Sequence, residues 1–448
     1  MEKDYFALLQ MPNRVFIGES CGEKQFIFAR HEWLSMKQRI SFPWKSPSAV
    51  WFVFAPWILV IFLYWLDLTI FSEASIVRVL RALAPGLIPT ALVLLLFALF
   101  NLVSTAFKRR PEPEAIITVD LGHAYKMNRV LLKVFYAILV LEFLYFGQIP
   151  LISMMLGSDV THFDFGIPGL HGLLYAIGAA VATISFSLYL LTQQRKYLFQ
   201  VFMVLLVFLL LVTRKMFLVV GLQMLILYIG LVGWRRIGLI SLCILAVVYI
   251  FGFIGDIRTG REQFLDLAGL KVDYPEWLPS GFIWVYIYGI TPIANYVNMT
   301  ELLTPTFNFV DLFSWAIPPR ILSALFGVEL IGGFENDWQV SGAFNVASGF
   351  ANIFPTLGGQ VGIIIFATFV GLLIGYFAKV KSFYHMLSLC TIYASSVLMV
   401  FNNNLMSLNV AFQFVVYLIC SRLASSSARG QTRFINGSSS TGRHHVKT

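Results

Sequence analysis

Residues 195–236 read RKYLFQVFMVLLVFLLLVTRKMFLVVGLQMLILYIGLVGWRR, and this stretch decides the fold. Two apolar runs, 197–213 and 216–233, meet at Arg214 and Lys215 with no loop between them. Each run holds 17 or 18 residues, and about that many helical residues are needed to cross roughly 30 Å of hydrocarbon. We therefore predict a transmembrane helical hairpin with Arg214 and Lys215 at its tip.

The charges around the hairpin predict its orientation. A basic pair at 195–196 precedes the first apolar run, and another at 235–236 follows the second, so both lie at the end of the hairpin opposite its tip. Lys and Arg accumulate in short loops that stay in the cytoplasm, so the stems begin and end inside and the tip lies outside. A cation pair at an outer tip runs against this bias, and an anionic ligand at the outer membrane boundary explains it best. The alternative is that Arg214 extends to the outer lipid headgroups.

The composition of the whole chain is that of a polytopic membrane protein. Of its 448 residues 58% are hydrophobic and 12% charged, against about 25% charged in a typical soluble domain. The first 48 residues carry charges throughout and lack an early apolar core, so we expect no secretory signal and expect the first apolar run, which begins near Ala49, to direct insertion. The basic residues sort by membrane side and do not cluster, so we expect no nucleic-acid partner. The four cysteines are isolated, which predicts neither a disulfide framework nor a metal site.

The predicted fold class is an all-α polytopic membrane protein of ten or twelve transmembrane helices, with a large periplasmic region before the last three spans. With both termini in the cytoplasm, 24 of the 32 Lys and Arg residues lie inside, as the positive-inside rule requires. Ten apolar runs are long enough to be spans: 49–66, 83–106, 130–147, 169–192, 197–213, 216–233, 237–254, 360–378, 384–401 and 405–420.

These spans divide the chain into five segments. We expect a cytoplasmic arm over 1–48, seven spans over 49–254, a periplasmic, membrane-apposed active-site region over 255–359, three spans over 360–420, and a disordered basic cytoplasmic tail over 421–448.

The periplasmic region is too long for a plain connector, and loops of that length are usually functional. Its stretch 280–299 is apolar and interrupted by Gly289 and Pro292, and 307–330 is apolar around Arg320. We expect these pieces to be broken helices that lie on or dip into the outer leaflet and line a cavity. The alternative is an additional pair of spans, which would give twelve.

Five outer cations are candidates for binding a diphosphate. Arg258 and Arg261 lie one helical turn apart in GDIRTGREQF, and Arg320 follows two prolines; they join Arg214 and Lys215. The planar fork of arginine binds phosphate oxygens in pairs, and each charge-assisted contact contributes about 1.5–3 kcal/mol.

Other outer cations have plainer interpretations. Arg78 and Arg81 precede the second span and are expected to extend to the lipid headgroups. Arg261 has an alternative of this kind, an ordinary surface ion pair with Asp256 or Glu262.

His171 and Glu142 are candidates for acid–base chemistry. His171 lies in GIPGLHGLL at the outer entrance of the fourth span and is a candidate general base or diphosphate donor. The alternative is a histidine that is hydrogen-bonded within the bundle. Glu142 lies inside the third span, where a charge is costly unless paired, and a partner such as Arg214 would neutralise it. Asp256 and Asp337 are further carboxylates that could act as base or charge partner.

Four segments together resemble the bacterial O-antigen, or oligosaccharide repeat unit, polymerase family. They are GIPGLHGLL, LVTRKMFLVVGLQMLILY, GDIRTGREQF and FNVASGFANIFPTLGGQVGIIIFATFVG, and they cover most of 130–420 in order. In that family the large outer loop begins with an arginine followed by a glycine eleven positions on, as in Arg258 and Gly269. The second such arginine would be Arg320, but its eleventh following residue is Ile331.

The resemblance implies a glycosyltransferase that uses neither metal nor cofactor, in the bacterial inner membrane. Its substrates would be undecaprenyl-diphosphate-linked glycans at the periplasmic face, surrounded by membrane lipids, with a polysaccharide chain-length regulator as a further partner. Together with the outer position of Arg214 and His171, the resemblance makes Arg214, Arg258 and His171 the expected catalytic residues. The sugars, the linkage and its stereochemistry stay open. The alternatives are an O-antigen ligase and a transporter or flippase for lipid-linked oligosaccharide, although no repeat supports a transporter.

Overall fold

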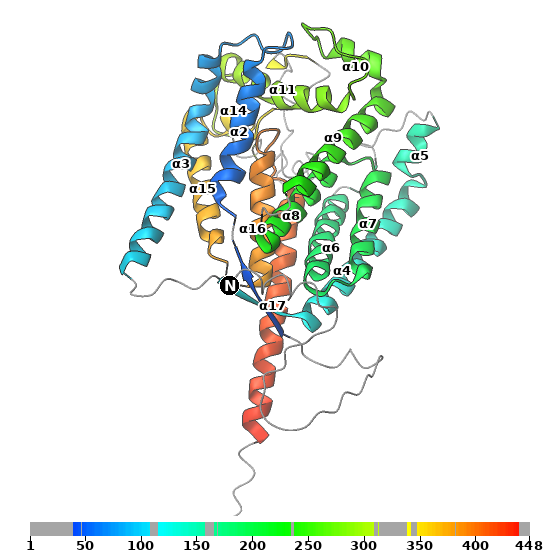
Figure 1. Cartoon of the computed structure of the whole chain (residues 1–448), viewed down its shortest axis with the longest axis vertical. Helices are drawn as coiled ribbons and strands as arrows, with labels where there is room; N and C mark the ends of the chain where they lie inside the picture. Colours follow the sequence, from blue (N-terminus) through cyan, green and yellow to red (C-terminus); the bar gives the residue numbers. More distant parts are fainter. Residues whose placement is uncertain are drawn as a thin grey trace, which may run out of the picture. The chain divides into compact units, whose positions relative to one another are not determined.

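The computed structural model describes the chain over residues 39–45, 47–107, 115–156, 165–167, 169–233, 237–308, 312, 338–341, 347–380 and 382–438. This part of the chain is mostly helical and contains one small sheet (Figure 1). Each of the ten predicted apolar runs corresponds to one helix. These helices are α2 Ala49–Trp65, α3 Ile76–Phe107, α4 Leu121–Phe146, α6 Leu170–Thr192, α7 Arg195–Leu210, α8 Arg214–Val232, α9 Ile237–Thr259, α15 Gln360–Ala378, α16 Phe383–Leu398 and α17 Leu408–Ser438.

The chain is an α-helical membrane protein. Among the described residues, five segments are long and apolar enough to cross a membrane: Ile76–Asn101, Leu121–Ser153, Leu170–Thr192, Lys215–Val232 and Gln360–Ala378. Helices α2 and α16 and the apolar part of α17 are shorter. Ten spans, and the orientation of the two termini, therefore stay predictions.

The helical hairpin is confirmed as a pair of helices, α7 and α8, joined by a turn of three residues. The backbone N–H and the hydroxyl of Thr213 both donate to the carbonyl of Phe208, at 3.0 and 3.1 Å. These bonds satisfy two groups at the helix ends that would otherwise lack partners. Val212 takes a positive φ of 56°, which turns the chain sharply enough for α8 to begin at Arg214.

Helix α6 is the central helix of this part of the molecule, because it contacts α4, α7, α8 and α17. Its middle is built from small residues, with Gly178, Ala179, Ala180 and Ala182 all buried. Small residues let helices approach closely where hydrocarbon offers no hydrophobic driving force. The rings of Phe135 and Phe208 fill the space beside Gly178.

We expected the stretch 280–299 to be broken at Gly289 and Pro292, and this was wrong. The structure has one continuous helix there, α11 Gly281–Leu302. Proline removes one helical hydrogen bond, but α11 is buried against its neighbours and those contacts stabilise it. The Tyr286 hydroxyl accepts from the backbone N–H of Leu68 at 3.0 Å. The Tyr296 hydroxyl donates to the carbonyl of Ala82 at 3.3 Å. Most of 307–330 lies outside the described residues.

A two-stranded antiparallel sheet occurs where the sequence predicted only a cytoplasmic arm and an inner loop. Strand β1 Arg39–Trp44 pairs with β2 Ala115–Asp120. Alternate side chains of both strands are buried, as in an amphipathic sheet. The ring of Trp44 packs against Gly230 of α8, which ties the sheet to the end of the hairpin.

We predicted a disordered tail from residue 421 onward. In the structure residues 421–438 are helical, because α17 continues without interruption to Ser438. The physical reason is local: this stretch contains no proline, so the backbone hydrogen bonds begun in the apolar part of α17 can propagate. Residues 439–448 lie outside the described part of the chain.

Helices α9 and α11 approach backbone to backbone, and this contact gives a stability prediction. A Cβ added at Gly281 would overlap the carbonyl oxygen of Val248. We expect Gly281→Ala to destabilise the protein by about 1–3 kcal/mol, as overpacking does. The measurement is the melting temperature in detergent. Gly221→Ala is the matched control, because a Cβ there meets no atom within 4 Å; an equal loss in both variants would contradict the close approach.

Candidate functional site

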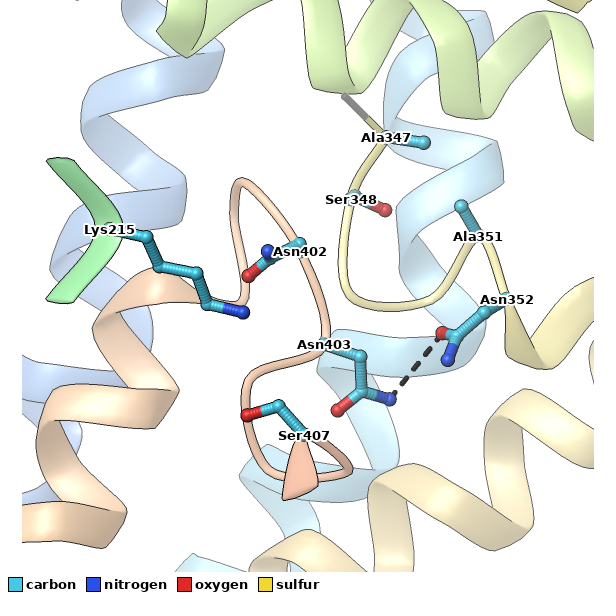
Figure 2. A pocket seen from close by; sticks show the side chains of 8 residues that line it. All are labelled: Lys215, Ala347, Ser348, Ala351, Asn352, Asn402, Asn403 and Ser407. Carbon is cyan, nitrogen blue, oxygen red and sulfur yellow. Dashed lines mark hydrogen bonds between the residues drawn. The ribbon is translucent and has the colours of Figure 1, made fainter. Parts of the chain in front are cut away.

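A cavity of about 90 Å³ lies at the hairpin tip. Three segments form it: the start of α8, the turn over 347–352, and the connection between α16 and α17 (Figure 2). The predicted topology of ten spans with both termini in the cytoplasm places all three segments on the outer side. The lining residues are Lys215, Ala347, Ser348, Ala351, Asn352, Asn402, Asn403 and Ser407. A cavity of this volume has room for several water molecules or a small charged group.

The turn over 347–352 is held on two sides by its backbone. The N–H of Ser348 donates to the carbonyl of Pro292 in α11 at 3.2 Å, and the N–H of Gly349 donates to the carbonyl of Met399 at 2.6 Å. A Cβ at Gly349 would lie 2.9 Å from that same carbonyl oxygen, so glycine permits the approach. These bonds fix where Asn352 presents its amide.

The connection between α16 and α17 is held by its own side chains. Asn403 Oδ1 accepts from the backbone N–H of Met406 at 3.2 Å. The hydroxyl of Ser407 donates to the carbonyl of Asn404 at 2.6 Å. Just past this connection, the amide of Asn409 contacts the sulfur of Met216 at 3.1 Å, which joins the starts of α17 and α8.

Two hydrogen-bond donors from different segments, Lys215 and Asn352, line the cavity. Within the part of the chain that the structure describes, no carboxylate lies within ion-pairing distance of the Lys215 ammonium. Asn352 is only 2% exposed, and its Nδ2 has no hydrogen-bond partner. Its Oδ1 accepts a long hydrogen bond, 3.5 Å, from the amide of Asn403. In Figure 2 the Lys215 ammonium and the Asn352 amide point into the space between their segments.

These two donors indicate what the cavity can bind. A buried donor without a partner is destabilising by about 1–3 kcal/mol, so a native protein that keeps one generally has a reason for it. A negatively charged group with several oxygens would accept from both Lys215 and Asn352. The site is therefore suited to a phosphate or another small oxyanion.

A second cluster joins two of the predicted residues, Glu142 and His171. Glu142 Oε2 lies 2.8 Å from His171 Nδ1, and His171 Nε2 lies 2.5 Å from the hydroxyl of Tyr175. Glu142 is fully buried in α4, and its Oε1 has no partner. A side chain at Gly166, where φ is 108°, would overlap the His171 ring. Glu142 is therefore paired with His171 and not with an arginine, among the described side chains.

Arg261 and Asp256 hold the loop that leads into α11. The guanidinium of Arg261 donates to the carbonyls of Glu276 and Leu278, at 2.8 and 3.1 Å. Asp256 accepts from the hydroxyl of Ser280 and, at 3.2 Å, from the indole of Trp284. Neither of the predicted ion pairs of Arg261 is formed. Arg261 therefore stabilises this loop through its hydrogen bonds to the two carbonyls.

Two other outer cations are paired with carboxylates. Arg78, expected to extend to the headgroups, makes a two-pronged contact with Glu301. The ammonium of Lys271 lies 2.7 Å from Asp67 Oδ1, and this contact holds the pKa of Asp67 below its ordinary value. Both pairs are exposed and contribute little to stability. Lys215 differs from these two cations, because no described carboxylate pairs with it.

The structure does not describe the side chains of four other predicted site residues. Arg214 begins α8 and Arg258 lies in the last turns of α9, and their side chains are outside the described part of the structure. Arg320 and Asp337 lie outside the described residues altogether.

The sequence reasoning missed Asn352, Asn402, Asn403 and Ser407. A signal was available for two of them, because Asn402, Asn403 and Asn404 are three consecutive amides between apolar runs. Amides in such a place are costly unless they are paired or bind something.

Comparisons of the chain with protein-family profiles, with curated proteins and with solved structures found no match.

Proposed function

We propose that this chain is a glycosyltransferase that polymerises undecaprenyl-diphosphate-linked oligosaccharide repeat units at the periplasmic face of the bacterial inner membrane. The observation that carries the proposal is the cavity at the hairpin tip, where, among the described residues, the Lys215 ammonium has no carboxylate acceptor and the Asn352 Nδ2 has no acceptor at all. A diphosphate linked to a lipid supplies such an acceptor at the membrane boundary. The resemblance to the O-antigen polymerase family supports the same assignment.

The proposed reaction transfers the growing chain to one repeat unit. A hydroxyl oxygen of the acceptor sugar forms a bond to the anomeric carbon of the donor, and the bond from that carbon to the diphosphate oxygen breaks. The electron pair of the broken bond leaves with the diphosphate. Negative charge therefore builds on the diphosphate as the sugar passes through an oxocarbenium-like state. Preorganised donors such as Lys215 and Asn352 stabilise that charge in a site where it needs no rearrangement.

The first test is deletion of the gene in a strain that makes a surface polymer. We expect surface lipid carrying at most one repeat unit, because the unit would still be made, exported and ligated but not polymerised. The measurement is a gel of surface polysaccharide with and without the gene, and a plasmid copy should restore the ladder. Loss of all repeats, including the single one, would instead indicate a ligase or a flippase and would contradict the polymerase proposal.

A further inference from the structure

Glu142, His171 and Tyr175 form a line of three hydrogen-bonded groups from two neighbouring helices. Glu142 belongs to α4, and His171 and Tyr175 lie one turn apart on α6. Both ring nitrogens of His171 are in contact, one with the carboxylate and the other with the phenol. A carboxylate on one nitrogen and a hydroxyl on the other is the arrangement in which an imidazole is oriented to accept a proton.

The proton positions follow from the partners. The carboxylate of Glu142 accepts the N–H of His171 at Nδ1, which leaves the lone pair on Nε2. The Tyr175 hydroxyl donates to that lone pair, so its oxygen keeps lone pairs available to accept a proton from another group. A fully buried carboxylate such as Glu142 is costly in this setting and stabilises positive charge on the neighbouring ring.

The line ends beside the hairpin tip. The ring of Tyr175 packs against the ring of Phe208, with centroids 5.8 Å apart, and the carbonyl of Phe208 accepts from the hydroxyl of Thr213, immediately before Arg214 and Lys215. Gly172, the residue directly after His171, lies against Leu408, the neighbour of the cavity-lining Ser407. The side chain of His171 is 19% exposed. The phenol therefore lies near the hairpin tip, while the Glu142 carboxylate is fully buried.

We propose that Glu142, His171 and Tyr175 form a proton relay that takes the proton from the acceptor sugar hydroxyl. This inference rests on the proposed function. As the acceptor oxygen bonds to the donor carbon, its proton moves to the Tyr175 oxygen and the Tyr175 proton moves to His171 Nε2. The resulting imidazolium is stabilised by Glu142 and returns its proton to water after the product leaves. Tyr175 contacts the substrate, and Glu142 is a positioning residue.

The test is Tyr175→Phe, assayed with purified lipid-linked repeat units in proteoliposomes. General acid–base groups contribute about 10²–10⁴-fold to rate, so we expect kcat to fall about 10²-fold while KM for the repeat unit stays unchanged. Glu142→Gln should lower kcat in the same direction, because it removes the charge that stabilises the imidazolium.

Tyr417→Phe is the matched control. Tyr417 is also a buried phenol, with its hydroxyl 2.6 Å from Thr183 and 2.9 Å from the amide of Gln413, but it lies in a separate network. If the loss of turnover came only from removing a buried hydrogen bond, Tyr175→Phe and Tyr417→Phe would lose turnover equally. If Tyr175 belongs to a proton relay, Tyr175→Phe loses turnover and Tyr417→Phe does not.

Three outcomes are informative. Loss of kcat in Tyr175→Phe but not in Tyr417→Phe, with normal protein levels in the membrane, supports the relay. A Tyr175→Phe variant that polymerises at the wild-type rate overturns the relay and leaves the proposed function standing. A wild-type protein that makes no polymer from lipid-linked units overturns the proposed function, and the relay with it.

Discussion

Replacing Lys215 with alanine is expected to lower the rate of polymerisation by about 10²–10³-fold, the loss typical of removing one preorganised charge stabiliser. Lys215 lines the cavity without a carboxylate partner among the described residues, so its charge is available for the leaving diphosphate. Lys215→Arg should retain part of the activity, because the charge remains but the larger guanidinium must fit a cavity of about 90 Å³. The measurement is polymer length in vivo and turnover in proteoliposomes.

Lys271→Ala is the matched control for Lys215→Ala. Lys271 is another outer cation, but its ammonium is held by Asp67. The membrane level of each variant is measured as well, so that lost folding is not mistaken for lost chemistry. Arg214→Ala belongs in the same series, since the sequence places Arg214 on the same tip. Full-length polymer from Lys215→Ala at normal protein levels would show that the cavity does not serve the reaction.

Asn352→Asp should have an effect as large as that of Lys215→Ala. The substitution keeps the shape of the side chain, but it replaces an unpartnered buried donor with a carboxylate that faces Lys215 across the cavity. The carboxylate would neutralise the ammonium and repel a diphosphate. We expect at least a 10²-fold loss of turnover, and a smaller loss in Asn352→Ala, which removes the donor without adding charge.

A double variant separates a shared ligand from independent damage. If Lys215 and Asn352 act on one diphosphate, the loss in Lys215→Ala with Asn352→Ala should be smaller than the product of the two single losses, because residues that act on one group are not additive. Fully multiplicative losses would indicate that the two residues do not act on a common group.

Local sequence predicted the helices well because the membrane imposes a length on them. A span needs about 20 apolar residues, and all ten runs predicted on this ground correspond to helices. The hairpin tip at Arg214 and Lys215 follows from the same constraint. The strand pair was missed because β1 and β2 are separated by α2 and α3, and no turn between them marks their register.

The candidate site was predicted only in part. Lys215, Glu142 and His171 were identifiable as charged or titratable groups in apolar surroundings, where such groups are costly and usually functional or paired. Their partners were not identifiable: Glu142 was expected to neutralise an arginine, and it contacts His171. Tyr175 was hidden among many aromatic residues, because nothing in the sequence distinguishes a phenol that bonds to a histidine from one that anchors at the membrane interface.

The sequence by itself determined that this is a helical membrane protein with a cationic hairpin tip, because hydropathy and charge act over a single segment at a time. Only the tertiary structure decided that the turn at 347–352 and the asparagines at 402–403 meet at that tip. Hydrogen bonds from Ser348 and Gly349 to carbonyls of two other segments hold the turn there. Contacts of this kind depend on how helices pack, and hydropathy alone leaves that packing open because lipid and side chains are equally apolar.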